Sequence, residues 1–141
     1  MTSNFAAQLQ DIANRGEAAM LACFKNSIQE LVENNMQVPT ARGGRMRVDT
    51  GFLRNSGVAN IGSMPTGEAI RSAGAKPGQY VWSSEQLVTV LAKLKMGDVF
   101  YFGWTAAYAE VREIYDAYME TSLMRWQQIV STNADKIRKK K

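Results

Sequence analysis

The sequence contains no histidine and only one cysteine among its 141 residues. Without histidine, Ser-His-Asp triads, Cys-His dyads and histidine-ligated metal sites are excluded. The single cysteine, Cys23, cannot close an intrachain disulfide or supply a thiolate cluster for zinc. No flanking cation activates it as a nucleophile, so we interpret Cys23 as a small buried hydrophobe. We therefore predict no enzyme activity, no cofactor and no metal site.

Long apolar runs are also missing. The densest one, Val99–Phe102, falls far short of the roughly 18–20 residues that a membrane span needs. The N-terminus shows no basic leader followed by an apolar block, and Asp11 lies where such a block would be. We therefore expect no secretory signal and no membrane contact. A single cysteine fits synthesis in a cytoplasm.

Positive charge is concentrated at one end of the chain. The sequence has 17 Lys and Arg residues against 13 Asp and Glu residues. Five of the positive residues lie among the last six positions, which we name the basic tail, 136–141. The rest of the chain carries a net charge of −1, unlike a dedicated duplex-DNA binder with a basic face. The tail is either a solubilising end or a contact for nucleic acid.

The remaining composition is that of one globular domain spanning residues 1–141. Hydrophobic residues make up 45% and charged residues 21%, which is enough apolar material for a core. Residues 37–47 contain Gly43 and Gly44 and predict a flexible basic loop. The other predicted elements are strands near 58–62, 80–82 and 99–104, a helix over 85–95, and a second long helix from Asp116 to Ile137 whose buried face includes Met119 and Leu123.

Apolar residues recur at spacings of three and four over residues 4–34 and predict one long helix. Phe5, Leu9 and Ile12 begin this stripe, and Cys23 continues it. Such a helix is roughly 46 Å long, whereas a compact domain of this size is about 37 Å across. Two alternatives follow: the helix bends at Gly16, or another chain covers part of its stripe.

Aromatic residues gather in one short segment, which holds Phe100, Tyr101, Phe102, Trp104 and Tyr108. A strand that is apolar on both faces must be covered on both. Either the chain itself supplies both covers, or this strand lies near a subunit interface.

Two charged clusters allow more than one interpretation. Glu110 and Glu113 could form a paired carboxylate site, although a solvated helix face or an intersubunit ion pair is the simpler interpretation. Arg42, Arg45 and Arg47, with Arg54, could contact DNA phosphate or an acidic protein, or could belong to a solvated loop.

Residues 48–56 read Val-Asp-Thr-Gly-Phe-Leu-Arg-Asn-Ser. This nonapeptide resembles a motif of the small tail-completion and head–tail joining proteins of long-tailed bacteriophages. In that family a long N-terminal helix precedes the motif. An aromatic strand, a Tyr-Ala-x-x-x-Glu segment and a C-terminal helix follow it. Here these parts correspond to Phe100–Trp104, Tyr108 with Glu113, and the helix from Asp116. One departure is that Ile114–Asp116 replaces the Gly-Thr turn that often follows the family's glutamate.

The resemblance implies an α+β fold, with a small antiparallel sheet packed against long N- and C-terminal helices. It also implies a structural virion protein that forms a ring of six copies at the tail or neck. There it would contact tail-tube and head or neck proteins. Genomic DNA would pass through its lumen without sequence-specific binding. The candidate residues for the interface with partners or with other copies are Arg42, Arg45, Arg47, Asp49, Thr50, Arg54, Phe102, Trp104, Tyr108 and Glu113. The competing hypothesis is a nucleic-acid-binding module that uses the Arg42–Arg54 loop and the basic tail.

Overall fold

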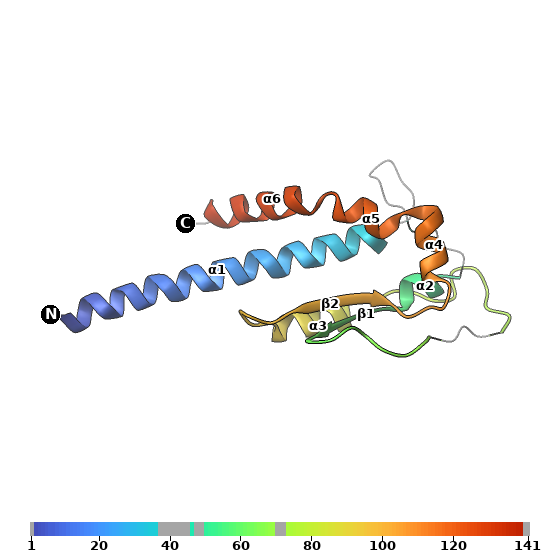
Figure 1. Cartoon of the computed structure of the whole chain (residues 1–141), viewed down its shortest axis with the longest axis horizontal. Helices are drawn as coiled ribbons and strands as arrows, with labels where there is room; N and C mark the ends of the chain where they lie inside the picture. The colour runs from blue at the N-terminus through green and yellow to red at the C-terminus, as the bar shows by residue number, and fades with distance from the viewer. Residues whose placement is uncertain (1, 37–45, 47–49, 70–72, 140–141) are drawn as a thin grey trace.

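The computed structural model describes residues 2–36, 46, 50–69 and 73–139 (Figure 1). Six helices and two strands follow one another along these residues: α1 (Thr2–Met36), α2 (Phe52–Asn55), β1 (Gly57–Ile61), α3 (Glu85–Lys93), β2 (Phe100–Trp104), α4 (Ala109–Asp116), α5 (Tyr118–Leu123) and α6 (Trp126–Arg138). The α+β fold is confirmed, because a small antiparallel sheet lies beside the long N-terminal helix and the C-terminal helices.

The sheet has two strands, and a side chain closes one of its edges. β1 and β2 pair antiparallel, with Ala59 opposite Phe102. On the other side of Ala59, its backbone N–H donates to Gln86 Oε1 over 2.9 Å. Gln86 Nε2 donates to the Ala59 carbonyl over 2.7 Å. The amide of Gln86 on α3 therefore takes the place of a third strand at this point.

Most of the elements predicted for the middle of the chain are confirmed, and one predicted strand is wrong. The strands near 58–62 and 99–104 and the helix over 85–95 are confirmed, with slightly shorter bounds. The strand over 80–82 is wrong: Tyr80 donates its backbone N–H to Thr50 O over 2.7 Å, and Val81 is 78% exposed. This segment braces a turn and pairs with no strand among the residues that the structure describes. The predicted loop 37–47 lies almost wholly outside the described residues, apart from the buried Met46.

The hydrophobic core lies at one end of the molecule, where the C-terminal half of α1 meets α2, α3 and the sheet. Ile28, Val32 and Met36 from α1 are buried there. Leu87 and Leu91 contribute from α3, whose exposed residues fall between them in helical spacing. The other buried apolar residues of this core are Met46, Phe52, Leu53, Ala59, Leu94, Ala106, Ala109 and Tyr118.

The long N-terminal helix is confirmed, and it does not break at Gly16. α1 continues through Gly16 for 35 residues, which is roughly 52 Å of helix. Its N-terminal part projects beyond α6 and beyond the sheet (Figure 1). Phe5, Leu9 and Ile12 on this part are 65%, 51% and 59% exposed. Of the two alternatives, the bend is therefore wrong, and the stripe has no cover there among the described residues.

A single C-terminal helix from Asp116 to Ile137 is wrong. α4 ends at Asp116, Ala117 adopts a left-handed conformation with φ 49°, and α5 and α6 follow as separate helices. Each interruption resets the helical phase, so the spacing of three and four no longer marks a common face. Met119 and Leu123, predicted to be buried, are 41% and 52% exposed.

Candidate functional site

Residues 50–56 of the nonapeptide form a turn that requires glycine. Thr50 Oγ1 accepts a hydrogen bond from the Phe52 backbone N–H over 3.2 Å. Gly51 has φ 84° and precedes α2. A Cβ at this position would clash with the Tyr80 carbonyl oxygen. Conformation and close approach therefore both demand glycine at position 51.

The same motif ties three parts of the chain together. Arg54 Nη1 donates to the Met36 carbonyl at the end of α1 over 3.2 Å, which is a favourable interaction for a cation at a helix C-terminus. Ser56 Oγ donates to Leu53 O over 2.6 Å. The Ser56 carbonyl accepts the backbone N–H of Thr105 over 3.1 Å, just after β2. The described part of the motif thus acts as an internal brace.

The aromatic residues of β2 and α5 pack on one another inside the chain. The ring centroids of Phe102 and Trp104 are 5.1 Å apart, and those of Trp104 and Tyr118 are 5.0 Å apart, both edge-to-face. On the opposite face of β2, Gly103 lies under Met64, whose Cε is 3.5 Å from the position of an added Cβ. The chain therefore contributes some cover on both faces of β2, but all five residues of the strand are only half-buried, so the choice between the two alternatives stays open.

Glu113 lies in α4 and bonds the first turn of α5. Its Oε2 accepts the backbone N–H of Met119 over 2.9 Å, and its Oε1 accepts that of Glu120 over 3.0 Å. A carboxylate at the first turn of a helix satisfies amides that have no partner within the helix. Both oxygens of Glu113 therefore have structural partners, while neighbouring Glu110 is exposed.

The predicted interface residues divide into two groups. Arg42, Arg45, Arg47 and Asp49 lie outside the described residues. The others bond or pack within the chain in the ways given above, and Tyr108 packs against Phe52 with ring centroids 6.0 Å apart. A role for either group at a subunit interface stays a prediction. The described residues in question are Thr50, Arg54, Phe102, Trp104, Tyr108 and Glu113.

An open groove of about 660 Å³ lies between α1, α6 and the turn before β2. Phe24 and Trp126, which both line it, meet edge-to-face with ring centroids 6.2 Å apart. Cys23 Sγ lies 3.7 Å from the Val130 carbonyl oxygen. The lining residues are Ala19, Met20, Leu21, Cys23, Phe24, Lys95, Met96, Gly97, Asp98, Trp126, Val130, Ala134, Ile137 and Arg138.

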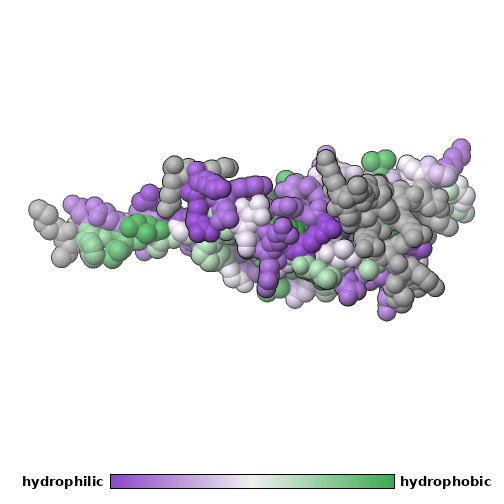
Figure 2. Space-filling view, turned by 90° about the horizontal axis from the view of Figure 1, so that it is seen from above, coloured by the Kyte–Doolittle hydropathy of each residue, from purple (hydrophilic) through white to green (hydrophobic). Residues whose placement is uncertain are grey.

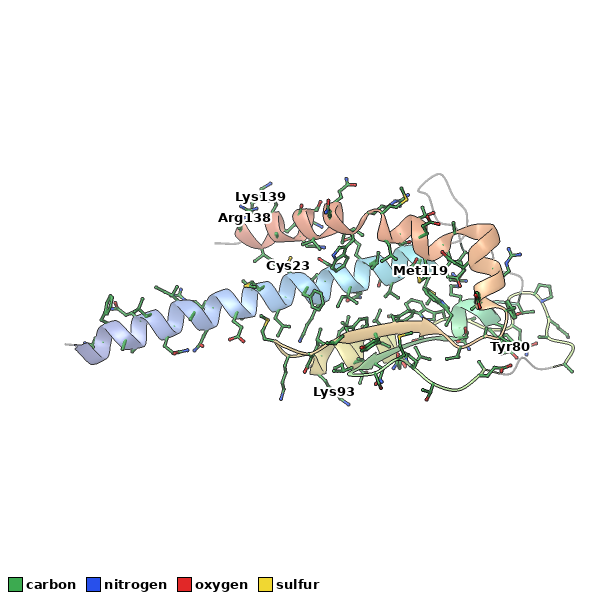
Figure 3. The ribbon with its side chains drawn as sticks, viewed as in Figure 1. Cys23, Tyr80, Lys93, Met119, Arg138 and Lys139 are labelled. Atoms are coloured by element: carbon green, nitrogen blue, oxygen red, sulfur yellow. The ribbon has the colours of Figure 1, made fainter. Side chains whose placement is uncertain are left out.

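This groove is apolar and open to water. Met20 is 63% exposed, and Met96 and Phe24 are 46% and 39% exposed. Cys23 lies on α1 beside α6, and Arg138 and Lys139 mark the far end of α6 (Figure 3). Hydrophobic surface also covers part of the projecting end of α1 (Figure 2). The uncovered stripe of α1 and the groove together form the candidate assembly surface.

The signal for this surface was present in the spacing of residues 126, 130, 134 and 137. The sequence places them on one helix face, and all four are half-buried and line the groove. The spacing cannot reveal that α1, α6 and the turn at Lys95–Asp98 together leave a groove.

Other kinds of site find no support in the part of the chain that the structure describes. No three Cys, Asp or Glu residues there lie close enough together to hold a metal ion. None of the described helices has both the length and the apolar character of a membrane span. Searches against family models, curated proteins and solved structures found no match to this chain.

Proposed function

We propose that this chain is a structural protein of a long-tailed bacteriophage virion. On this proposal, six copies form a ring at the junction of tail and neck. The ring completes the tail tube and provides the surface to which the head or its neck proteins join. Genomic DNA passes through the lumen without sequence-specific binding, and no chemical step takes place on the protein. The chain is made in the host cytoplasm and ends up in the virion.

The observation that carries this proposal is the exposed half of α1. A helix that runs unbent past the rest of the molecule presents Phe5, Leu9 and Ile12 to water. Burying a side chain of this kind contributes about 1.5–3 kcal/mol, so the uncovered stripe favours association. A subunit of a ring has neighbours that cover such a surface, whereas an isolated monomer does not.

The geometry of the nonapeptide supports a structural role as well. Its glycine, threonine and arginine all contact the chain's own backbone, at Tyr80, Phe52 and Met36. Glu113, the acidic residue of the Tyr-Ala-x-x-x-Glu segment, is likewise occupied by two backbone amides. These residues therefore have clear reasons to be present without any substrate, which fits a part whose function is its shape.

The direct test is removal of this protein from assembling particles. A phage carrying a deletion of the coding sequence is imaged by negative stain, with the intact gene supplied from a plasmid as the control. We expect filled heads lying free beside headless tails, and joined particles when the plasmid is present. A normal yield of joined particles from the deletion would contradict the proposal.

Nucleic-acid binding remains the second candidate because Lys136 and Lys139 are exposed at the end of α6. That function predicts affinity for DNA that falls steeply with salt and is lost when residues 136–141 are removed. Replacing Lys136, Lys139, Lys140 and Lys141 by glutamine removes the same lysine charges but keeps Ile137, which lines the groove. Nucleic-acid binding predicts that this variant loses its affinity for DNA, whereas the ring proposal predicts that it still joins heads to tails. The two functions are therefore separated by testing this one variant in both assays.

A further inference from the structure

The lining of the groove between α1 and α6 is mostly apolar. The small residues Ala19 and Cys23 of α1 line it together with Val130 and Ile137 of α6. Apolar grooves of this kind bind amphipathic helices through anchors spaced at i, i+3 or i+4, and i+7. The described residues of the same chain leave the groove unfilled.

The projecting end of α1 has the matching features. Phe5, Leu9 and Ile12 stand at i, i+4 and i+7, and each is more than half exposed. The nearby charges, Asp11 and Arg15, already pair with each other over 2.9 Å on the helix surface. This end can therefore enter an apolar site without bringing an unpaired charge of its own.

Residue size changes along the α1 stripe in a way that links the two surfaces. The first three positions are large: Phe5, Leu9 and Ile12. The next three in the same spacing are small: Gly16, Ala19 and Cys23. Gly16 has no atom within 4 Å of an added Cβ. Two helices pack closely where large side chains of one fall against small side chains of the other.

We propose that the groove is the docking site for residues 5–12 of α1 from a second copy of this chain, with Phe5, Leu9 and Ile12 as the anchors. The chain carries both an uncovered anchor and an unfilled groove of the same polarity, so a second copy satisfies both. The anchor and the groove are different surfaces. The contact between them can therefore repeat from one copy to the next, and such an assembly can close as a ring.

The number of copies in a closed ring rests on the proposed function, whereas the contact between two copies does not. The native Cys23 offers a direct probe of that contact because it is one of the residues that line the groove. A disulfide forms only where two Cα atoms come within about 4.4–6.8 Å. A cysteine introduced on the anchor of one copy therefore reports whether that anchor reaches the groove of another.

The experiment compares Leu9→Cys with Asn14→Cys, each in the full chain with Cys23 retained. Asn14 is an exposed α1 residue five positions along the helix and so turned away from the stripe. After mild oxidation, chains are separated without reductant. We expect crosslinked chains from Leu9→Cys at a yield about tenfold above Asn14→Cys, because docking raises the local thiol concentration. The added Cys23→Ser change should abolish the product.

A groove-filling variant gives a second readout. Ala134→Trp, added to Leu9→Cys, should lose the crosslink, whereas Ser131→Trp on the exposed side of α6 should keep it. Circular dichroism checks that both variants are folded. Equal crosslinking at positions 9 and 14, no crosslink at position 9, or a product that survives Cys23→Ser would each overturn the contact. A ladder of products up to six chains supports the ring, and a product of two chains alone contradicts the ring while retaining the contact.

Discussion

The two halves of α1 carry the same apolar spacing but lie in opposite surroundings. In the C-terminal half, Ile28, Val32 and Met36 are 5%, 3% and 3% exposed, under the sheet and α6. In the N-terminal half, Phe5 and Leu9 are 65% and 51% exposed. The comparison teaches that apolar residues at spacings of three and four occur both where the chain covers a helix itself and where the chain leaves the helix open to water.

The sharpest way to test this comparison is to truncate one apolar residue in each half. Ile28→Ala should lower the free energy of unfolding by about 2–5 kcal/mol, because it leaves a cavity in the core. Leu9→Ala should change it by less than about 0.5 kcal/mol in dilute protein, because its side chain contacts mostly water. Urea denaturation measures both. A large loss for Leu9→Ala at low concentration would show that the projecting half is part of the folded core.

The edge of the sheet shows how thoroughly the body of the molecule is closed. Gln86→Ala removes the amide that bonds both backbone groups of the 2%-exposed Ala59. We expect a loss of about 1–3 kcal/mol, because two buried polar groups are left without partners. The matched control is Gln127→Ala, which alters an exposed glutamine on α6. Thermal unfolding that ranks the two variants equally would contradict the assigned role of Gln86.

A smaller effect is expected at the start of α5. Glu113→Ala removes the acceptor for two backbone amides and should cost about 1 kcal/mol, the usual value for losing a helix cap. Glu110→Ala, three residues earlier and exposed, should cost less than about 0.5 kcal/mol. Chemical denaturation of the pair tests the assignment, and reversed rankings would refute it.

The smallest effect is expected in the projecting half of α1. Gly16→Ala adds a methyl group where nothing lies within 4 Å, so it should favour the local helix by up to about 1 kcal/mol. Amide hydrogen exchange around residue 16 should slow, while the midpoint of global unfolding stays nearly unchanged. Faster amide exchange around residue 16 would contradict the conclusion that position 16 has room for a side chain.

Much of the fold was accessible from the sequence because most elements carry strong local signals. The long stripe of α1 and the β-branched and aromatic residues from Val99 to Trp104 both predict what is observed. The failures arose where local and distant requirements compete. Ala117 takes a left-handed conformation that few alanines adopt. Two hydrogen bonds join the helices on either side of it: Met119 N–H donates to the Glu113 carboxylate, and the Tyr118 hydroxyl donates to the Ala109 carbonyl.

The candidate assembly surface was only half predictable. The stripe from Phe5 to Ile12 is visible in the spacing, and the length of the helix predicts that another chain covers it, which stays a prediction. The groove is not visible, because it depends on how far α6 and the turn at Lys95–Asp98 stand from α1. That separation is set by packing among distant residues, such as Asn133 Nδ2 donating to Glu30 Oε2 over 3.1 Å, and no local pattern encodes it.

The measurement that tests the central claim most directly is head–tail joining by a single variant, Leu9→Asp, supplied to particles that lack the native protein. Its melting temperature is compared with that of the native chain to establish that the fold is intact. The account predicts a folded protein that fails to restore joined particles, because a charge on the exposed stripe prevents its burial by a neighbour. Full restoration of joining by a folded Leu9→Asp protein would contradict it.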